Sequence, residues 1–83
     1  MSVRVLLVDD HAVVREGYRG LIERSADVSV IAEAGTGEAG LAMYREHRPD
    51  VVVMDIALPD RSGIAVLQEL IAEAPEARVL MFS

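Results

Sequence analysis

The sequence contains no cysteine, no tryptophan and no lysine, and all eight of its cationic side chains are arginines. Without cysteine the chain has neither a disulfide framework nor a thiolate metal site. A net charge of −6 and an isoelectric point of about 4.7 make duplex nucleic acid and anionic membrane surfaces poor partners. Apolar runs are too short for a signal peptide or a membrane span, so we expect a soluble cytoplasmic protein.

The residues that are present predict one small α/β domain. The chain has 83 residues, of which 52% are hydrophobic, enough for a packed core. Short apolar runs rich in valine, leucine and isoleucine alternate with segments of helical periodicity, and this alternation predicts a parallel sheet. The expected strands are 3–8, 28–34, 51–54 and 79–82, and the expected helices are 11–24, 37–47 and 63–74.

Capping residues and apolar spacing define these helices further. Asp10, Thr36 and Ser62 stand where N-caps of the first, second and third helix are expected. Prolines after the second and third helix end them. The predicted core-facing residues are Val14, Tyr18, Leu21 and Ile22 in the first helix and Ile64, Leu67, Leu70, Ile71 and Ala74 in the third.

Carboxylates follow two of the predicted strands at their carboxyl ends. Asp9 and Asp10 end the first strand, Asp55 ends the third, and Ser83 ends the fourth. Because parallel strands share one carboxyl edge, these side chains should converge there. A lone aspartate after a strand is as often a cap or a turn residue, but three of them fit that explanation less well. Their mutual repulsion predicts a site for a hard cation such as Mg²⁺.

The segment AGTGEAGLA contains Gly35, Gly37 and Gly40 in the spacing of a dinucleotide-binding fingerprint. It follows a strand and opens a helix, and Asp55 lies about where a ribose-binding acid would be sought. Against this, Glu38 in the first helical turn would take up the positive dipole that a pyrophosphate needs. A dinucleotide-binding half-domain therefore stays open as the weaker alternative to a tight strand-to-helix turn.

Three stretches resemble the receiver domain of response regulators, which has the CheY-like fold: LLVDDHAVVREGYRGLIE, RPDVVVMDIALPDRSGIAVLQEL and ARVLMFS. The Asp-Asp-His opening with Arg15-x-Gly17 is most similar to the LuxR/FixJ-type branch, whose members carry a helix-turn-helix output domain. The resemblance implies a flavodoxin-like, doubly wound parallel sheet. Here it would be incomplete, with four strands in the order 2-1-3-4 and three helices.

The resemblance also assigns roles to matching positions. Asp55 would accept a phosphoryl group from the phosphohistidine of a sensor histidine kinase. Asp10 would bind Mg²⁺ directly, Asp9 through water, and Ala57 through its backbone carbonyl. Ser83 would hydrogen-bond the phosphoryl group and report the switch. The protein would then be a signalling phosphoacceptor that assists its own phosphorylation and dephosphorylation rather than an enzyme, with Asp55 exposed as the nucleophile.

The same resemblance implies what lies outside residues 1–83, which would be the N-terminal part of one receiver domain. The fourth helix, the fifth strand with the family's phosphoryl-contacting lysine, the fifth helix and the output domain would be missing, so any contact with DNA would belong to that output domain. The edge at 79–82 and the first helix would be uncovered, which predicts self-association, for example as a dimer. A receiver remnant that serves only as an interaction surface is a further alternative.

One histidine adjoins the acid pair. His11 could contact a transition metal, but we expect it to be a solvated residue of the first helical turn. His47 is most simply a residue at a helix end, where its partial positive charge suits the dipole.

Overall fold

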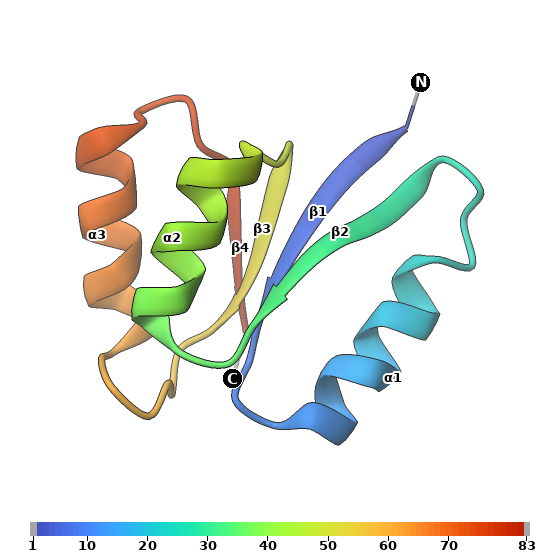
Figure 1. Ribbon diagram of the computed structural model, residues 1–83, viewed down its shortest axis with the longest axis horizontal. Helices are drawn as coiled ribbons and strands as arrows, with labels where there is room; N and C mark the ends of the chain where they lie inside the picture. The colour runs from blue at the N-terminus through green and yellow to red at the C-terminus, as the bar shows by residue number, and fades with distance from the viewer. Residues whose placement is uncertain (1, 83) are drawn as a thin grey trace.

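The computed structural model describes residues 2–82, in which strands and helices alternate along the chain (Figure 1). Within these residues, no helix is both long and apolar enough to cross a membrane. The strands are β1 (Val3–Val8), β2 (Val28–Ala34), β3 (Val51–Asp55) and β4 (Val79–Phe82), and the helices are α1 (Ala12–Ile22), α2 (Gly37–His47) and α3 (Gly63–Glu73).

The strands form one parallel sheet in the order β2-β1-β3-β4, as predicted. The central strand β1 is paired on both sides, so that Val8 lies opposite Ala34 of β2 and Met54 of β3. Asp55 at the end of β3 lies opposite Phe82 of β4. All four carboxyl ends therefore meet at one edge of the sheet, the lower edge in Figure 1.

Helices cover the two faces of the sheet unequally. Helices α2 and α3 lie on one face, and α1 lies on the other (Figure 1). The larger core lies under α2 and α3, whereas a smaller one lies under α1, where Tyr18 and Ile22 pack on Val5, Leu7 and Val30. The buried residues of the larger core are Leu6, Val8, Ala34, Leu41, Tyr44, Val52, Met54, Val66, Leu70 and Ala74.

The first helix differs from its prediction at both ends and along its face. It begins at Ala12 after His11, which occupies the N-cap position and whose side chain makes no capping hydrogen bond, so the expectation that Asp10 is its N-cap was wrong. The last turn ends at Ile22, two residues short of the predicted end. Leu21 is 60% exposed, because α1 is the one described helix on its face and packs mainly on β1 and β2.

The other two helices begin as predicted. Thr36 accepts the N–H of Ala39, and Ser62 accepts the N–H of Ile64. The predicted face of α3 was partly wrong. Val66, which was not predicted, is fully buried, while Ile64 and Ile71 are exposed. Because α3 packs beside α2 on one flank only, the outer part of its apolar stripe has no cover among residues 2–82.

Candidate functional site

The carboxyl edge of the sheet gathers a cluster of acidic side chains. Asp9 directly follows β1 and Asp55 is the last residue of β3, and the parallel register sets these strand ends side by side. One ligand atom from each of Asp9, Asp10, His11 and Asp55 lies within 4.8 Å of the others. We call these four residues the acidic site. The structure thus brings together the three aspartates that the sequence placed at this edge, and it adds a histidine.

Asp9 is the most buried member of the site, with only 1% of its surface exposed. Its Oδ1 accepts the backbone N–H of His11 at 2.9 Å. Its Oδ2 is buried and has no hydrogen-bond partner among the described residues. A buried carboxylate oxygen without a partner is costly, and a cation held by the surrounding carboxylates would remove that cost. The donor set, three carboxylates of which one has a buried oxygen without a partner, therefore fits a divalent metal ion.

Asp55 is also buried, at 7% exposure, so the expectation of an exposed aspartate was wrong. The start of α3 packs directly on the backbone that follows β3, and this contact depends on Gly63. A Cβ at that position would lie 2.3 Å from the carbonyl oxygen of Asp55 and 2.8 Å from the Cα of Ile56. The Gly63 N–H also donates to the Ile56 carbonyl. Gly63 thus fixes the backbone on which the Asp55 side chain is mounted.

The loop after β3 orients the Asp55 carboxylate. The backbone N–H of Ala57 donates to Asp55 Oδ1 at 3.0 Å. Ala57 also pairs with Ser62 in an isolated antiparallel bridge, which closes the loop before α3. The role of the Ala57 carbonyl as a metal ligand stays a prediction. Ser83 lies outside the described residues, although its neighbour Phe82 lies opposite Asp55 in the sheet.

His11 lies closer to the carboxylates than the sequence indicated. Its Nδ1 is 3.1 Å from Asp9 Oδ1 and 3.0 Å from Asp10 Oδ1. The hydrogen bond with Asp9 and, after it, the charge of Asp10 raise the pKa of His11 above its ordinary value of about 6.5. The side chain is 64% exposed, so it is solvated, as expected, and at the same time faces the acidic site.

An arginine that the sequence did not single out for the site anchors the loop between β1 and α1. Arg15 Nη1 donates to the backbone carbonyl of Asp9 at 2.6 Å, and its Nε donates to Glu33 of β2 at 3.1 Å. Arg19, one turn further along α1, donates to the other oxygen of Glu33. The pairing joins residues 18 positions apart in the chain, so no local pattern could have indicated it.

The glycine-rich turn before α2 is occupied by a side chain of the protein itself. Asp60 accepts the N–H groups of Gly37 and Glu38 at 2.8 and 3.0 Å. These are the helix N-terminal donors that a pyrophosphate would need. A Cβ at Gly37 would lie 2.6 Å from Val66, and one at Gly40 would lie 3.1 Å from Val8. The glycines therefore serve close packing, and the dinucleotide-binding alternative was wrong.

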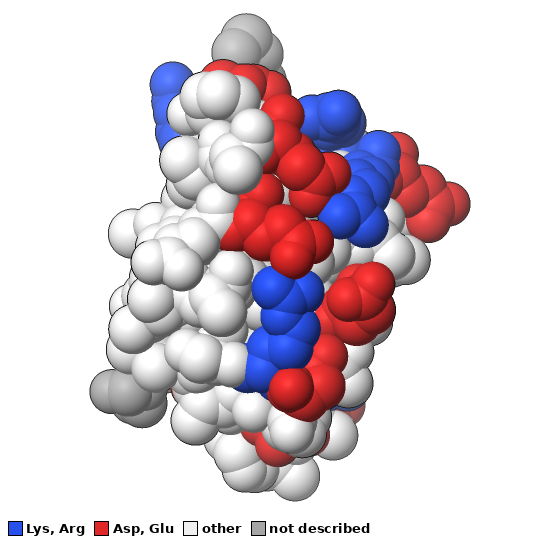
Figure 2. Space-filling view, turned by 90° about the vertical axis from the view of Figure 1, so that its left-hand side faces the viewer, with Lys and Arg blue, Asp and Glu red and all other residues white. Residues whose placement is uncertain are grey.

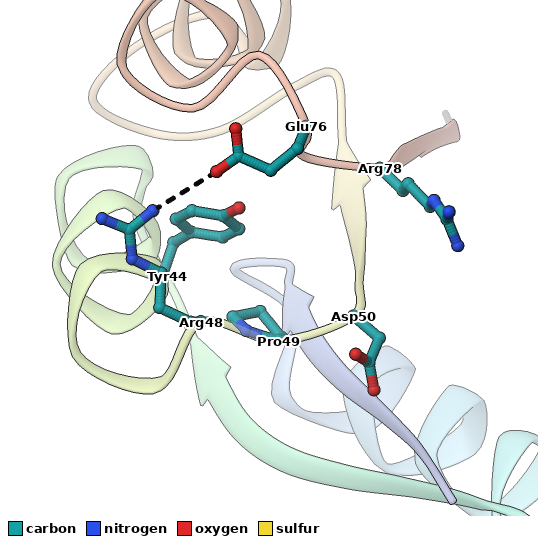
Figure 3. A pocket seen from close by; sticks show the side chains of 6 residues that line it. All are labelled: Tyr44, Arg48, Pro49, Asp50, Glu76 and Arg78. Carbon is teal, nitrogen blue, oxygen red and sulfur yellow. Dashed lines mark ion pairs between the residues drawn. The ribbon is translucent and has the colours of Figure 1, made fainter.

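A hollow lies at the opposite, amino edge of the sheet (Figure 3). It has a volume of about 300 Å³. Arg48 closes one side, with its guanidinium 5.5 Å from the ring centre of Tyr44 and 3.8 Å from the Glu76 carboxylate. Because Asp50 and Arg78 precede β3 and β4, this hollow lies away from the acidic site. Its lining residues are Tyr44, Arg48, Pro49, Asp50, Glu76 and Arg78.

Comparison with known proteins shows which proteins the chain is similar to. In sequence, the chain is 40% identical over 81 residues to the DNA-binding transcriptional activator DevR/DosR of Mycobacterium tuberculosis, covering 98% of this chain and 37% of that protein. It is equally similar, at 40% over 81 residues, to protein-glutamate methylesterase/protein-glutamine glutaminase 1 of Oleidesulfovibrio alaskensis, covering 98% of this chain and 22% of that protein. The chain thus spans well under half of these relatives.

Solved structures agree as well. A LuxR-family two-component response regulator from Aurantimonas sp. SI85-9A1 superposes with a TM-score of 0.95 at 45% identity, over 99% of this chain and 59% of that one. The model of the family described as response regulator receiver domain matches residues 5–83. The chain therefore belongs to the receiver domain family of two-component response regulators.

Proposed function

We propose that Asp55 accepts a phosphoryl group from the phosphohistidine of a sensor histidine kinase in a Mg²⁺-dependent reaction. One observation carries the proposal: Asp9, whose buried Oδ2 has no hydrogen-bond partner among residues 2–82, belongs to a cluster in which ligand atoms of Asp9, Asp10 and Asp55 lie within 4.8 Å of one another. Membership of a signalling family supports it. The carboxyl edge of an open α/β sheet is also the usual place for ligands.

Each residue of the acidic site would have its own role in the transfer of the phosphoryl group. Because the Ala57 N–H holds Asp55 Oδ1, the second oxygen, Oδ2, would be the one that attacks phosphorus. The P–N bond of the phosphohistidine breaks, and its electron pair returns to the imidazole. Asp10 and Asp9 would hold Mg²⁺, directly and through water, with the Ala57 carbonyl as a further ligand. When bound, Mg²⁺ neutralises the charge that builds up between the carboxylates and the phosphoryl oxygens. Ser83 would then hydrogen-bond the transferred group.

A second proposal concerns the longer protein of which this domain would be a part. The chain spans 59% of its structural relative from Aurantimonas, which supports residues 1–83 as the N-terminal part of a receiver domain. We propose that phosphorylation controls a LuxR-type DNA-binding output domain outside these residues. The name of DevR/DosR, a DNA-binding transcriptional activator, supports this and a cytoplasmic location, where bacterial DNA lies. The domain would act as a signal acceptor, and any enzymatic activity would belong to another domain.

We further propose that the uncovered apolar surfaces mediate self-association. Figure 2 shows the side that carries α3, where a band of charged side chains lies beside a broad area without charge. Arg45 in α2 forms ion pairs with Glu69 and Glu73 in α3. Ile64 of α3 and Leu80 of β4 are large apolar residues that are exposed. Exposed apolar patches of this kind are typical of protein interfaces.

Incubation with Mg²⁺ and a small phosphodonor, followed by intact mass spectrometry, tests the phosphoacceptor role. The wild-type protein should gain one phosphoryl group, and Asp55→Asn should gain none. Asp27→Asn, which removes an exposed carboxylate between α1 and β2, is the matched control and should react like wild type. Chelation of the metal should suppress the gain. An unmodified wild-type protein under all conditions would contradict the proposal and favour a remnant that acts only as an interaction surface.

A further inference from the structure

We propose that His11 is a ligand of the metal in the acidic site, through Nδ1, and that the site therefore prefers a first-row transition-metal ion such as Mn²⁺ to Mg²⁺. The inference rests on the proposed function, because it concerns the same metal site. It changes the donor set from oxygen alone to oxygen and nitrogen.

The distances around His11 match those between neighbouring ligands of one metal ion. Ligands about 2.1 Å from a metal and about 90° apart are separated by roughly 3.0 Å. Nδ1 lies 3.0 Å from Asp10 Oδ1 and 3.1 Å from Asp9 Oδ1. The candidate atoms of Asp9, Asp10, His11 and Asp55 all lie within 4.8 Å, so small side-chain shifts would bring them to one ion.

The fold places His11 here with several contacts. His11 is the residue before the first turn of α1 and has an extended backbone, with φ −96° and ψ 105°. Its N–H is held by Asp9 Oδ1, while Arg15 holds the carbonyl of Asp9 at 2.6 Å. Nδ1 thereby faces two carboxylates, an arrangement that requires a proton or a cation between the three groups. The other ring nitrogen can be solvated, because the side chain is largely exposed.

A nitrogen ligand discriminates between metal ions. Mg²⁺ takes oxygen ligands in a near-ideal octahedron and keeps several waters, so it gains little from an imidazole. Imidazole suits iron, nickel, copper and zinc ions, and the affinity of a site with nitrogen and oxygen ligands rises from Mn²⁺ along the first-row series. Removal of the imidazole should therefore weaken the binding of a transition-metal ion and leave that of Mg²⁺ nearly unchanged.

Pulsed electron paramagnetic resonance of bound Mn²⁺ tests this contact directly. The chain has two histidines, so protein labelled with ¹⁵N-histidine reports on His11 and His47 alone. We expect nitrogen coupling to Mn²⁺ that changes with the label, disappears in His11→Gln and persists in His47→Gln. His47 is the matched control because it ends α2, at the opposite edge of the sheet. In titrations, His11→Gln should weaken Mn²⁺ binding on the order of tenfold and change Mg²⁺ binding by less than about twofold.

Two results would overturn the proposal. One is Mn²⁺ bound without histidine coupling, and the other is equal Mn²⁺ affinity in wild type and His11→Gln. In either case the phosphoacceptor proposal would stand, provided that Asp55→Asn still abolishes phosphoryl gain. A wild-type protein that binds neither Mn²⁺ nor Mg²⁺ would overturn both, since the acidic site would then hold no ion.

Discussion

Asp60 shows how one side chain can determine what a helix end does. Its carboxylate accepts two backbone N–H groups at the start of α2, where the positive end of the helix dipole lies. Those hydrogen bonds, first from Gly37 and then from Glu38, lower the pKa of Asp60 below its ordinary range. The glycine-rich turn is therefore a docking point for the loop after β3, which ties α2 to the segment that orients Asp55.

We predict that Asp60→Asn lowers the free energy of unfolding at pH 7 and that the difference from wild type closes in acid. Because the folded pKa of Asp60 lies below the unfolded value of about 3.9, its stabilisation is complete above that value. It is lost as the pH falls through the folded pKa, so the difference should shrink below about pH 4. Urea denaturation from pH 7 to pH 2.5 measures this difference.

The comparison variant for Asp60→Asn is Asp27→Asn, which removes an exposed carboxylate outside any helix. It should stay close to wild type at pH 7. A difference between Asp60→Asn and wild type that is the same at every pH would show that the carboxylate charge is not what stabilises the helix end.

Single residues of the site differed in how far the sequence could predict them. The aspartates were predictable because the carboxyl ends of parallel strands share an edge, which is a property of the fold class. Asp60 and Arg15 were not, since each bonds a segment far away in the chain. Burial of Asp55 was missed because it depends on the close approach of α3 at Gly63, and local sequence does not encode such packing.

At the scale of elements, the order and type of the strands and helices followed from apolar periodicity, whereas the ends of α1 did not. What periodicity could not predict is how much of each apolar stripe is covered. Leu41 of α2 is 1% exposed in the larger core, whereas Leu21 of α1, which was predicted to face a core, is 60% exposed. An apolar stripe shows which side of a helix faces a core. Which neighbouring elements cover that side, and how completely, depends on the tertiary structure.

This difference predicts different costs for the same truncation. Leu41→Ala should lower the free energy of unfolding by about 3 kcal/mol, from lost apolar burial and the cavity that remains. Leu21→Ala should change it by less than about 0.5 kcal/mol, as expected of an exposed site. Urea denaturation followed by circular dichroism measures both. Similar losses in the two variants would mean that Leu21 is covered in solution, for instance by a second copy of the chain.

At the scale of the whole molecule, the sheet has one well-covered face and one that is half covered. Helix α1 lies over β1 and β2, while Tyr18 reaches Phe82 of β4 with ring centres 4.8 Å apart. Leu80, two residues before Phe82 on the same side of β4, is 64% exposed. Within residues 2–82, β4 pairs with β3 alone, so its outer backbone groups are free to pair with another strand.

We predict that this edge makes the protein self-associate and that a charge placed on it reverses the effect. Sedimentation velocity should show wild type shifting from monomer to dimer with rising concentration. Leu80→Lys should weaken the dimer on the order of tenfold, because a buried leucine contributes about 1.5–3 kcal/mol and an edge lysine opposes pairing. Val3→Lys makes the same change from an apolar to a charged side chain, but on the inner strand β1, and it should leave association unaltered. A wild-type protein that stays a compact monomer at high concentration would show that the uncovered edge is tolerated without a partner.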